Sequence, residues 1–247
     1  DEPRTMGYTL TGGYWGGLEK MPDYQNVSAS FDRYLYFNLD LNYEYIERSL
    51  GAVDGEKGYL FNVFSRNNYV NWHLFPQIVT TFDRGFALPL DHTSIWLRSA
   101  AGLSPALRKE PFANFYFGGF GNNWIDHQDE KRYREYYSFP GAGLNSIGGT
   151  NFVKLMTDLN LPPLRFRHIG IPALYPRWLR TSVFATGLST NLFAPSVSRT
   201  VFDCGTQVDM EIVLFSLFKT TLSAGYGLAI ENGRKLSDEW MFSLKIL

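Results

Sequence analysis

The chain has a single cysteine, Cys204, among its 247 residues. An intrachain disulfide and a metal site built from paired cysteines are therefore excluded. The four histidines are scattered without an H-E-x-x-H spacing, so the sequence predicts no metal site and no cofactor. Ser94 and His92 lack a third, orienting residue, and G-x-S-x-G and phosphate-binding glycine loops are absent from the sequence. We assign no catalytic residue and expect a protein that is not an enzyme.

Charge and long apolar runs are also scarce. Charged residues make up 19% of the chain, below the roughly 25% of typical soluble proteins. The net charge of -1 gives no global field that attracts nucleic acid, so we expect no nucleic-acid partner. No run approaches the ~18 to 20 apolar residues that a membrane-spanning helix needs. If the chain crosses a membrane, it does so with β-strands.

Aromatic residues, in contrast, are abundant at 17%, and apolar residues alternate with polar ones. Between Leu35 and Tyr45 every odd position is apolar, while the even positions from Asn38 to Glu44 are polar. Successive strand side chains point to opposite faces, so such a strand has one apolar and one wet face. The same alternation recurs at 207–214 and 239–246. A soluble sandwich can show this pattern, but aromatic and charged faces favour a barrel with lipid outside and water inside.

We count about twelve strand candidates, and together they predict one domain over residues 1–247. The candidates are 6–14, 25–34, 35–48, 57–68, 75–88, 92–104, 112–120, 147–161, 175–188, 199–214, 219–231 and 237–247. Turn residues such as Asp54-Gly55 and Asn232-Gly233 separate them. The predicted fold is an all-β, antiparallel transmembrane β-barrel. Because a barrel protein is exported and no signal peptide precedes Asp1, we expect a mature form or a piece of something longer.

One connection, 121–146, is long, charged and aromatic. A structureless loop of ~25 residues is uncommon unless it has a function. Glycine pairs flank it, Gly118-Gly119 before and Gly148-Gly149 after, and we interpret them as hinges of a loop folded into the lumen. An external loop and simple strand bends at the glycines stay open as alternatives.

The order of motifs resembles the BamA/TamA-like superfamily of outer-membrane insertases and two-partner secretion transporters, also called the bacterial surface antigen family. The matching features are a strand ending in Gly118-Gly119, a long loop, the strand after Gly148-Gly149 with its Pro162-Pro163 turn, and closing strands up to Leu247. In that family the loop carries V-R-G-F/Y. Its arginine is best matched by Arg134, in Tyr133-Arg134-Glu135-Tyr136, or else by Arg132.

The resemblance implies that the loop arginine pairs with an acidic residue and locks the loop against the lumen wall. We therefore expect a loop lock made of Arg134, Arg132 and Tyr136. The family's acidic position falls near Ala185, where no acid is present, so the candidates for the partner are the following lumen carboxylates: Asp203, Asp158, Asp209 and Glu211. An unpaired buried arginine costs several kcal/mol, which is why a partner is expected.

The resemblance further implies a Gram-negative outer-membrane location, contact with lipid and a polypeptide client. A client strand would pair with the closing strand 238–247. The family's POTRA domains and about four of its usual sixteen strands are not seen in the sequence, so the chain is a smaller barrel or the C-terminal part of a sixteen-stranded one. The main alternatives are a non-catalytic barrel that anchors or partners other envelope proteins or subunits, and a passive solute channel.

Overall fold

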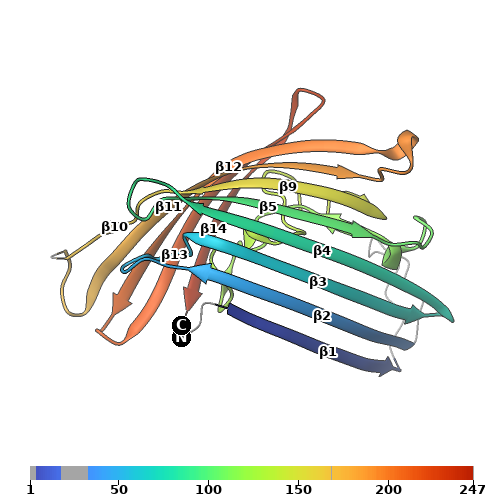
Figure 1. The fold of residues 1–247 in the computed structure, drawn as a ribbon, viewed down its shortest axis with the longest axis horizontal. Helices are drawn as coiled ribbons and strands as arrows, with labels where there is room; N and C mark the ends of the chain where they lie inside the picture. The colour runs from blue at the N-terminus through green and yellow to red at the C-terminus, as the bar shows by residue number, and fades with distance from the viewer. Residues whose placement is uncertain (1–3, 18–32, 168, 247) are drawn as a thin grey trace.

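The computed structural model describes residues 4–17, 33–167 and 169–246, and these residues form an all-β protein (Figure 1). No α-helix is present among them. Their helical elements are short 3₁₀ turns, and none is long and apolar enough to cross a membrane. The sheet is built from ten long strands: β1 (Arg4–Gly16), β2 (Arg33–Glu47), β3 (Lys57–Val70), β4 (His73–Ala87), β5 (Ser94–Leu103), β9 (Asn151–Asn160), β11 (Leu174–Thr190), β12 (Arg199–Leu214), β13 (Phe218–Glu231) and β14 (Arg234–Ile246).

Each long strand pairs antiparallel with the next long strand along the chain. Strand β5 pairs with β9 rather than with the segment that follows it, because residues 104–150 leave the sheet at this position. Two short strands complete the described sheet: β7 (Ile125–Asp126) beside β14, and β10 (Leu164–Arg165) beside β11. The all-β, antiparallel prediction is therefore confirmed over the described residues.

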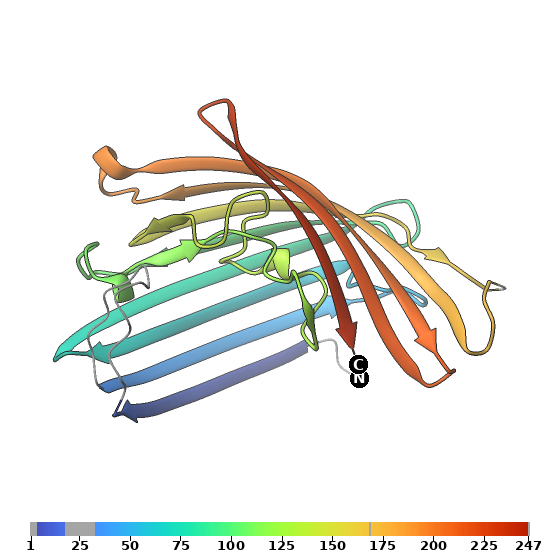
Figure 2. The same ribbon diagram turned by 180° about the vertical axis from the view of Figure 1, so that it is seen from behind.

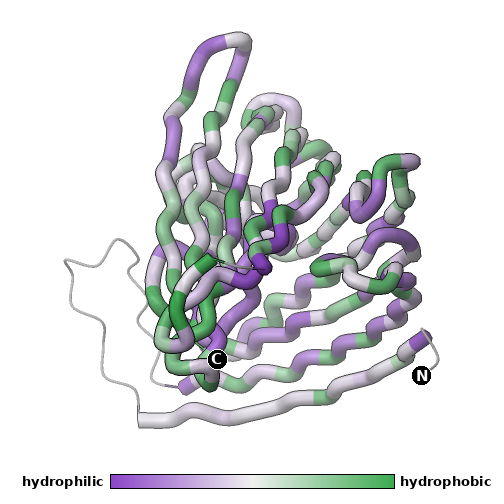
Figure 3. Tube along the Cα trace, turned by 90° about the vertical axis from the view of Figure 1, so that its left-hand side faces the viewer, coloured by the Kyte–Doolittle hydropathy of each residue, from purple (hydrophilic) through white to green (hydrophobic). Residues whose placement is uncertain are grey.

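The alternation read from the sequence explains why these segments form strands. On β2, Leu35, Phe37 and Leu41 are exposed on the convex face of the sheet. Asp40 faces the other way and accepts a hydrogen bond from Asn62 Nδ2 of β3 at 3.1 Å. Figure 3 shows polar and apolar residues alternating along the strands in the same manner. The period of two thus sets which face each side chain occupies.

The hairpin turns use residues that tolerate a left-handed backbone. In the β13–β14 turn, Asn232 and Gly233 have φ values of 51° and 73°, as a two-residue type I′ turn requires. The β3–β4 turn has Asn71 and Trp72 at 48° and 66°. These tight turns keep neighbouring strands in a continuous antiparallel register.

The sheet curves strongly, but over the described residues it does not close into a barrel. Among the described residues, strand β1 pairs with β2 alone, and β14 pairs on its second side only with the two residues of β7. A barrel needs a continuous ladder between its first and last strands. Here a loop segment takes part of the edge on which that ladder would form.

Two strand predictions need correction, and a third is largely untested. The segment 112–120 does not join the large sheet: it forms a 3₁₀ turn, η1 (Pro111–Ala113), and the short β6 (Phe115–Phe117). The segment 147–161 divides into β8 (Ile147–Gly149), which pairs with β6, and β9. The predicted strand 25–34 lies largely outside the described residues, and its last two residues belong to β2.

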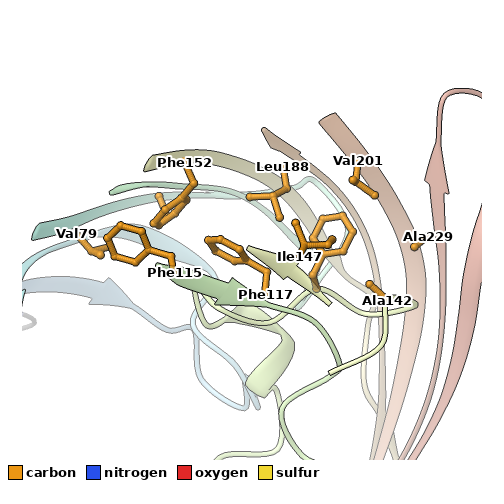
Figure 4. Packing of buried hydrophobic residues seen from close by; sticks show 11 residues of the cluster. Val79, Phe115, Phe117, Ala142, Ile147, Phe152, Leu188, Val201 and Ala229 are labelled. Atoms are coloured by element: carbon orange, nitrogen blue, oxygen red, sulfur yellow. The ribbon is translucent and has the colours of Figure 1, made fainter. Parts of the chain in front are cut away.

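The core lies on the concave side of the sheet, beneath β6 and β8. Phe115 and Phe117 of β6 meet Phe152 of β9 edge-on, with ring centroids 5.0 and 4.7 Å apart (Figure 4). Leu188 of β11 and Ile147 of β8 belong to the same buried cluster. Aromatic residues thus attach the 112–150 region to the inner face of the sheet, which positions the loop that follows β6.

Candidate functional site

The loop 121–146 lies against the concave face of the sheet (Figure 2). Two backbone hydrogen bonds join its ends: Gly119 N donates to Ala142 O at 2.9 Å, and Phe139 N donates to Gly119 O at 3.0 Å. Gly118 and Gly119 both have positive φ, 148° and 73°. Gly148 and Gly149 instead lie in β8 with ordinary strand geometry. Only the first glycine pair therefore needs the backbone freedom of glycine to turn the chain, and the hinge role of all four stays a prediction.

Arg134 connects the loop to strand β9. It ends a 3₁₀ turn, η2 (Arg132–Arg134), and its Nε donates to Asp158 Oδ2 at 2.8 Å while Nη2 donates to Asn160 Oδ1 at 2.9 Å. The Asp158 side chain has no exposed surface. Burial alone lowers the pKa of Arg134, but the Asp158 carboxylate outweighs it and raises the pKa above its ordinary value. The guanidinium therefore stays charged and paired.

The other three acidic candidates do not contact Arg134. Asp209 pairs with Arg180 Nε at 2.9 Å, and Glu211 pairs with Arg177 at 2.9 Å. Asp203 is buried on β12 and forms no ion pair with the described residues. Of the four candidates, the structure brings only Asp158 to Arg134.

The other two predicted members of the loop lock make different contacts. Arg132 stays within the loop: its Nη2 donates to the Tyr137 hydroxyl at 2.7 Å, and Nη1 lies 3.8 Å from Asp126. The Tyr136 ring packs against Phe64, with ring centroids 5.1 Å apart, and against Phe152. Arg132 thus organises the loop itself, whereas Tyr136 contributes apolar packing.

Tyr133, between the two arginines, was not predicted as a site residue. Its side chain is fully buried and stacks on Phe184 of β11 with ring centroids 4.5 Å apart. The hydroxyl donates to Asp158 Oδ1 at 3.0 Å and is hydrogen-bonded to the Ser182 hydroxyl. Burial raises the pKa of Tyr133 well above its usual range, and the Asp158 charge adds to this. The phenol therefore remains a neutral donor to the same carboxylate that pairs with Arg134.

Two buried lysines also tie the loop to the sheet. Lys154 of β9 donates to the backbone carbonyls of Glu135 and Ser138 at 2.8 and 2.5 Å, so a sheet residue holds the loop backbone directly. Lys131 of the loop reaches Asn160 Oδ1 and Asp54 Oδ2, both at 2.7 Å. The sequence analysis predicted neither contact, since a lone lysine in a strand or loop carries no signal about its partner.

Asp54 lies in the connection between β2 and β3 and joins two cations. It pairs with Lys131 of the loop at 2.7 Å and with Arg180 of β11 at 2.9 Å. Burial alone raises the pKa of Asp54, but Lys131, Arg134 and Arg180 outweigh it and hold this pKa well below its usual range. Burial lowers the pKa of Lys131 to about 8, and nearby Arg134 acts in the same direction. The network links the loop to both halves of the sheet.

Glycines on β13 make room for the loop. A Cβ at Gly227 would come within 2.7 Å of Pro140, and one at Gly225 within 2.8 Å of the Phe120 ring. In the loop, Gly141 has φ +85°, and a Cβ there would lie 2.6 Å from the Ala229 backbone nitrogen. Loop and sheet therefore approach each other more closely than side chains allow.

A cavity of about 580 Å³ separates the loop from the inner faces of β2 to β5. Much of its lining is charged, including Asp83 and Arg98, which form an ion pair, and Glu44, Arg132 and Glu135. Within the described residues, no group of histidine, cysteine or acidic side chains could hold a metal ion. The arrangement places the loop over a cavity with a largely charged lining.

Comparison of the chain with protein-family models, with curated proteins and with solved structures found no match.

Proposed function

We propose that the protein is an outer-membrane β-barrel of the insertase type, which assists the insertion or translocation of polypeptide at the outer membrane of a Gram-negative cell. The observation that carries the proposal is the charged loop held by Arg134 and Asp158 on the concave face of a sheet with an open first-to-last edge. A loop fixed in this way restricts the interior, and an open edge offers backbone groups to another strand.

The membrane part of the proposal rests on the convex face. Large apolar side chains are exposed there on most long strands, among them Phe82 on β4, Leu155 on β9, Phe202 on β12, Leu222 on β13 and Phe242 on β14. Soluble monomers rarely expose contiguous apolar patches larger than a few hundred Å². Lipid is the solvent that such a face matches, and the charged concave face matches water.

The experiment that tests the activity uses lipid vesicles containing the full chain. An unfolded eight-stranded outer-membrane protein is added, and its folding is followed by the gel shift between heated and unheated samples. We expect faster folding than in empty vesicles, and loss of the acceleration in Arg134→Ala but not in Arg132→Ala. Equal rates with empty vesicles would overturn the proposed activity while leaving the membrane location untouched.

A second candidate is an anchoring barrel in a larger envelope complex, and the exposure of β1 favours it. Met6, Tyr8 and Leu10 are more than half exposed, and the second edge of β1 has no partner strand in the described chain. Under this alternative, the chain extracted in mild detergent carries a stoichiometric partner protein. A passive channel is supported less, since the docked loop takes up the concave side.

A further inference from the structure

The segment 122–127 of the loop runs along the outer edge of the last strand, β14. Three alternate residues of β14 meet it through their backbone groups: Phe242 N donates to Asn123 Oδ1 at 3.1 Å, Leu244 N donates to Trp124 O at 3.3 Å, and Ile246 O lies 2.5 Å from His127 Nδ1. Between these contacts, β7 pairs in parallel with Leu244 and Lys245. The segment behaves as a short additional strand.

Alternate residues of a strand direct their backbone groups to the same edge. One edge of β14 is taken by β13 along its length, so Phe242, Leu244 and Ile246 present the other edge. An exposed edge of this kind is a template for pairing with any extended chain. The segment 122–127, here called the edge cap, satisfies the C-terminal part of this template.

The strand that fits the capped edge is β1 of the same chain. Both strands have 13 residues. The ten long strands alternate in direction from β1 to β14, so β1 and β14 run antiparallel, as barrels with an even number of strands require. The β1 residues Met6, Tyr8 and Leu10 continue the apolar face of Trp240 and Phe242, and all five are exposed.

The side chains on the other face of β1 also match the corresponding face of β14. Thr5, Thr9 and Thr11 lie on the face opposite to Tyr8, which is the face that Ser243 presents on β14. Small hydroxyl side chains suit the wet interior of a barrel. Length, direction and both faces of β1 thus match the edge that the cap occupies.

We propose that the edge cap and β1 compete for β14, so that the capped sheet is the open form and displacement of the cap lets β1 close the barrel. The loop sets the balance, since Asn122 Nδ2 donates both to Glu130 O at 2.7 Å and to Ser243 Oγ at 3.3 Å. Docking of the loop by Arg134 therefore favours the open form. This regulation rests on the proposed barrel function, because closure matters only for a sheet that surrounds a lumen.

Disulfide trapping in the purified full chain, in detergent micelles, separates the two forms. In a Cys204→Ser background, the pair Ile125→Cys and Leu244→Cys reports the cap, since these residues are register partners. The pairs of Ser243→Cys with Thr5→Cys, Thr9→Cys or Thr11→Cys report closure. The cap is weakened with Asn123→Ala and His127→Ala together, and Gln128→Ala, exposed and next to the cap, is the matched control.

With the intact cap we expect the 125–244 disulfide and little of any closure disulfide. Weakening the cap should raise the ratio of closed to capped species by about 30-fold, the effect of removing two hydrogen bonds of ordinary net strength, while Gln128→Ala changes nothing. Closure disulfides that are absent or unchanged in the weakened variant overturn the proposal, and so do disulfides that join two copies. The readout needs no client, so an inactive protein that still switches contradicts only the proposed activity.

Discussion

Replacing Arg134 with alanine is the perturbation that the structure defines most sharply. The change removes the ion pair with Asp158, the hydrogen bond to Asn160 and the nearby charge that Asp54 faces at 4.0 Å. Removing one partner of a buried ion pair costs about 3–5 kcal/mol. Asp158 retains Arg98 at 3.4 Å and the Tyr133 hydroxyl, which places the expected loss at the low end, about 3 kcal/mol.

A loss of about 3 kcal/mol raises the undocked fraction of the loop by about 100-fold, since each 1.4 kcal/mol is a factor of ten. Chymotrypsin measures that fraction, because its targets Tyr136 and Tyr137 lie in the loop and their cleavage requires undocking. We expect Arg134→Ala to be cleaved about 100-fold faster than the unmodified chain, within the range that single buried-pair losses produce.

Arg132→Ala is the matched control, since it removes the same side chain two residues away. Within the described residues, the Arg132 guanidinium bonds to Tyr137 and pairs with Asp126, both inside the loop, so its loss leaves the attachment to β9 intact. We expect cleavage within about threefold of the unmodified chain, as for surface substitutions of small effect. If both variants are cleaved equally fast, or if Arg134→Ala resists like the unmodified chain, the loop is held by apolar packing and the ion pair has no locking role.

Three further predictions concern the same docked loop. Lys154→Met keeps the length of the side chain but leaves the Glu135 and Ser138 carbonyls without their donor, so the free energy of unfolding in guanidinium should fall by about 3 kcal/mol; a fall under about 1 kcal/mol contradicts this. Gly141→Ala, at φ +85° and against the Ala229 backbone, should lower the stability by about 1–3 kcal/mol, whereas Gly143→Ala, whose nearest atom would be 3.8 Å away, should leave the melting temperature unchanged. Since the pKa of Asp54 is depressed in the folded chain, its contribution is full above its unfolded value of about 4 and is lost as the pH falls below it. Chymotrypsin is inactive there, so pepsin cleavage between pH 4 and 2 is the measurement, and Asp54→Asn should flatten the pH dependence.

The loop site shows how far sequence reasoning reaches. The pattern Tyr133-Arg134-Glu135-Tyr136 directed attention to Arg134, and four acids were left as its partners. The choice among them depends on how the loop lies on the sheet, which no local pattern encodes. Lys154 carries no sequence signal for its role, although it holds two loop carbonyls at short distance. The burial of Tyr133 depends on its packing against Phe184 of β11, a contact that exists only once the loop lies on the sheet.

The strand predictions also divide into those that the local pattern decides and those that the tertiary structure decides. Segments with sustained alternation, such as 35–48 and 199–214, became the long strands β2 and β12. The segment 112–120 is equally aromatic, yet it left the sheet because β9 takes the place beside β5 and the Phe115 and Phe117 rings pack on Phe152 instead. Competition between two segments for one edge is decided by the assembled fold.

The sequence by itself determined the period of the chain: apolar residues at every second position specify strands with one apolar and one polar face, and the Asn232-Gly233 pair specifies the turn between the last two strands. Only the tertiary structure decided which carboxylate holds Arg134, and that residues 122–127 cover the edge of β14. The physical reason is the separation in sequence of the residues that interact. Face alternation and turn geometry are set by neighbouring residues, whereas an ion pair or an edge contact joins residues that meet only after the sheet has curved around its loop.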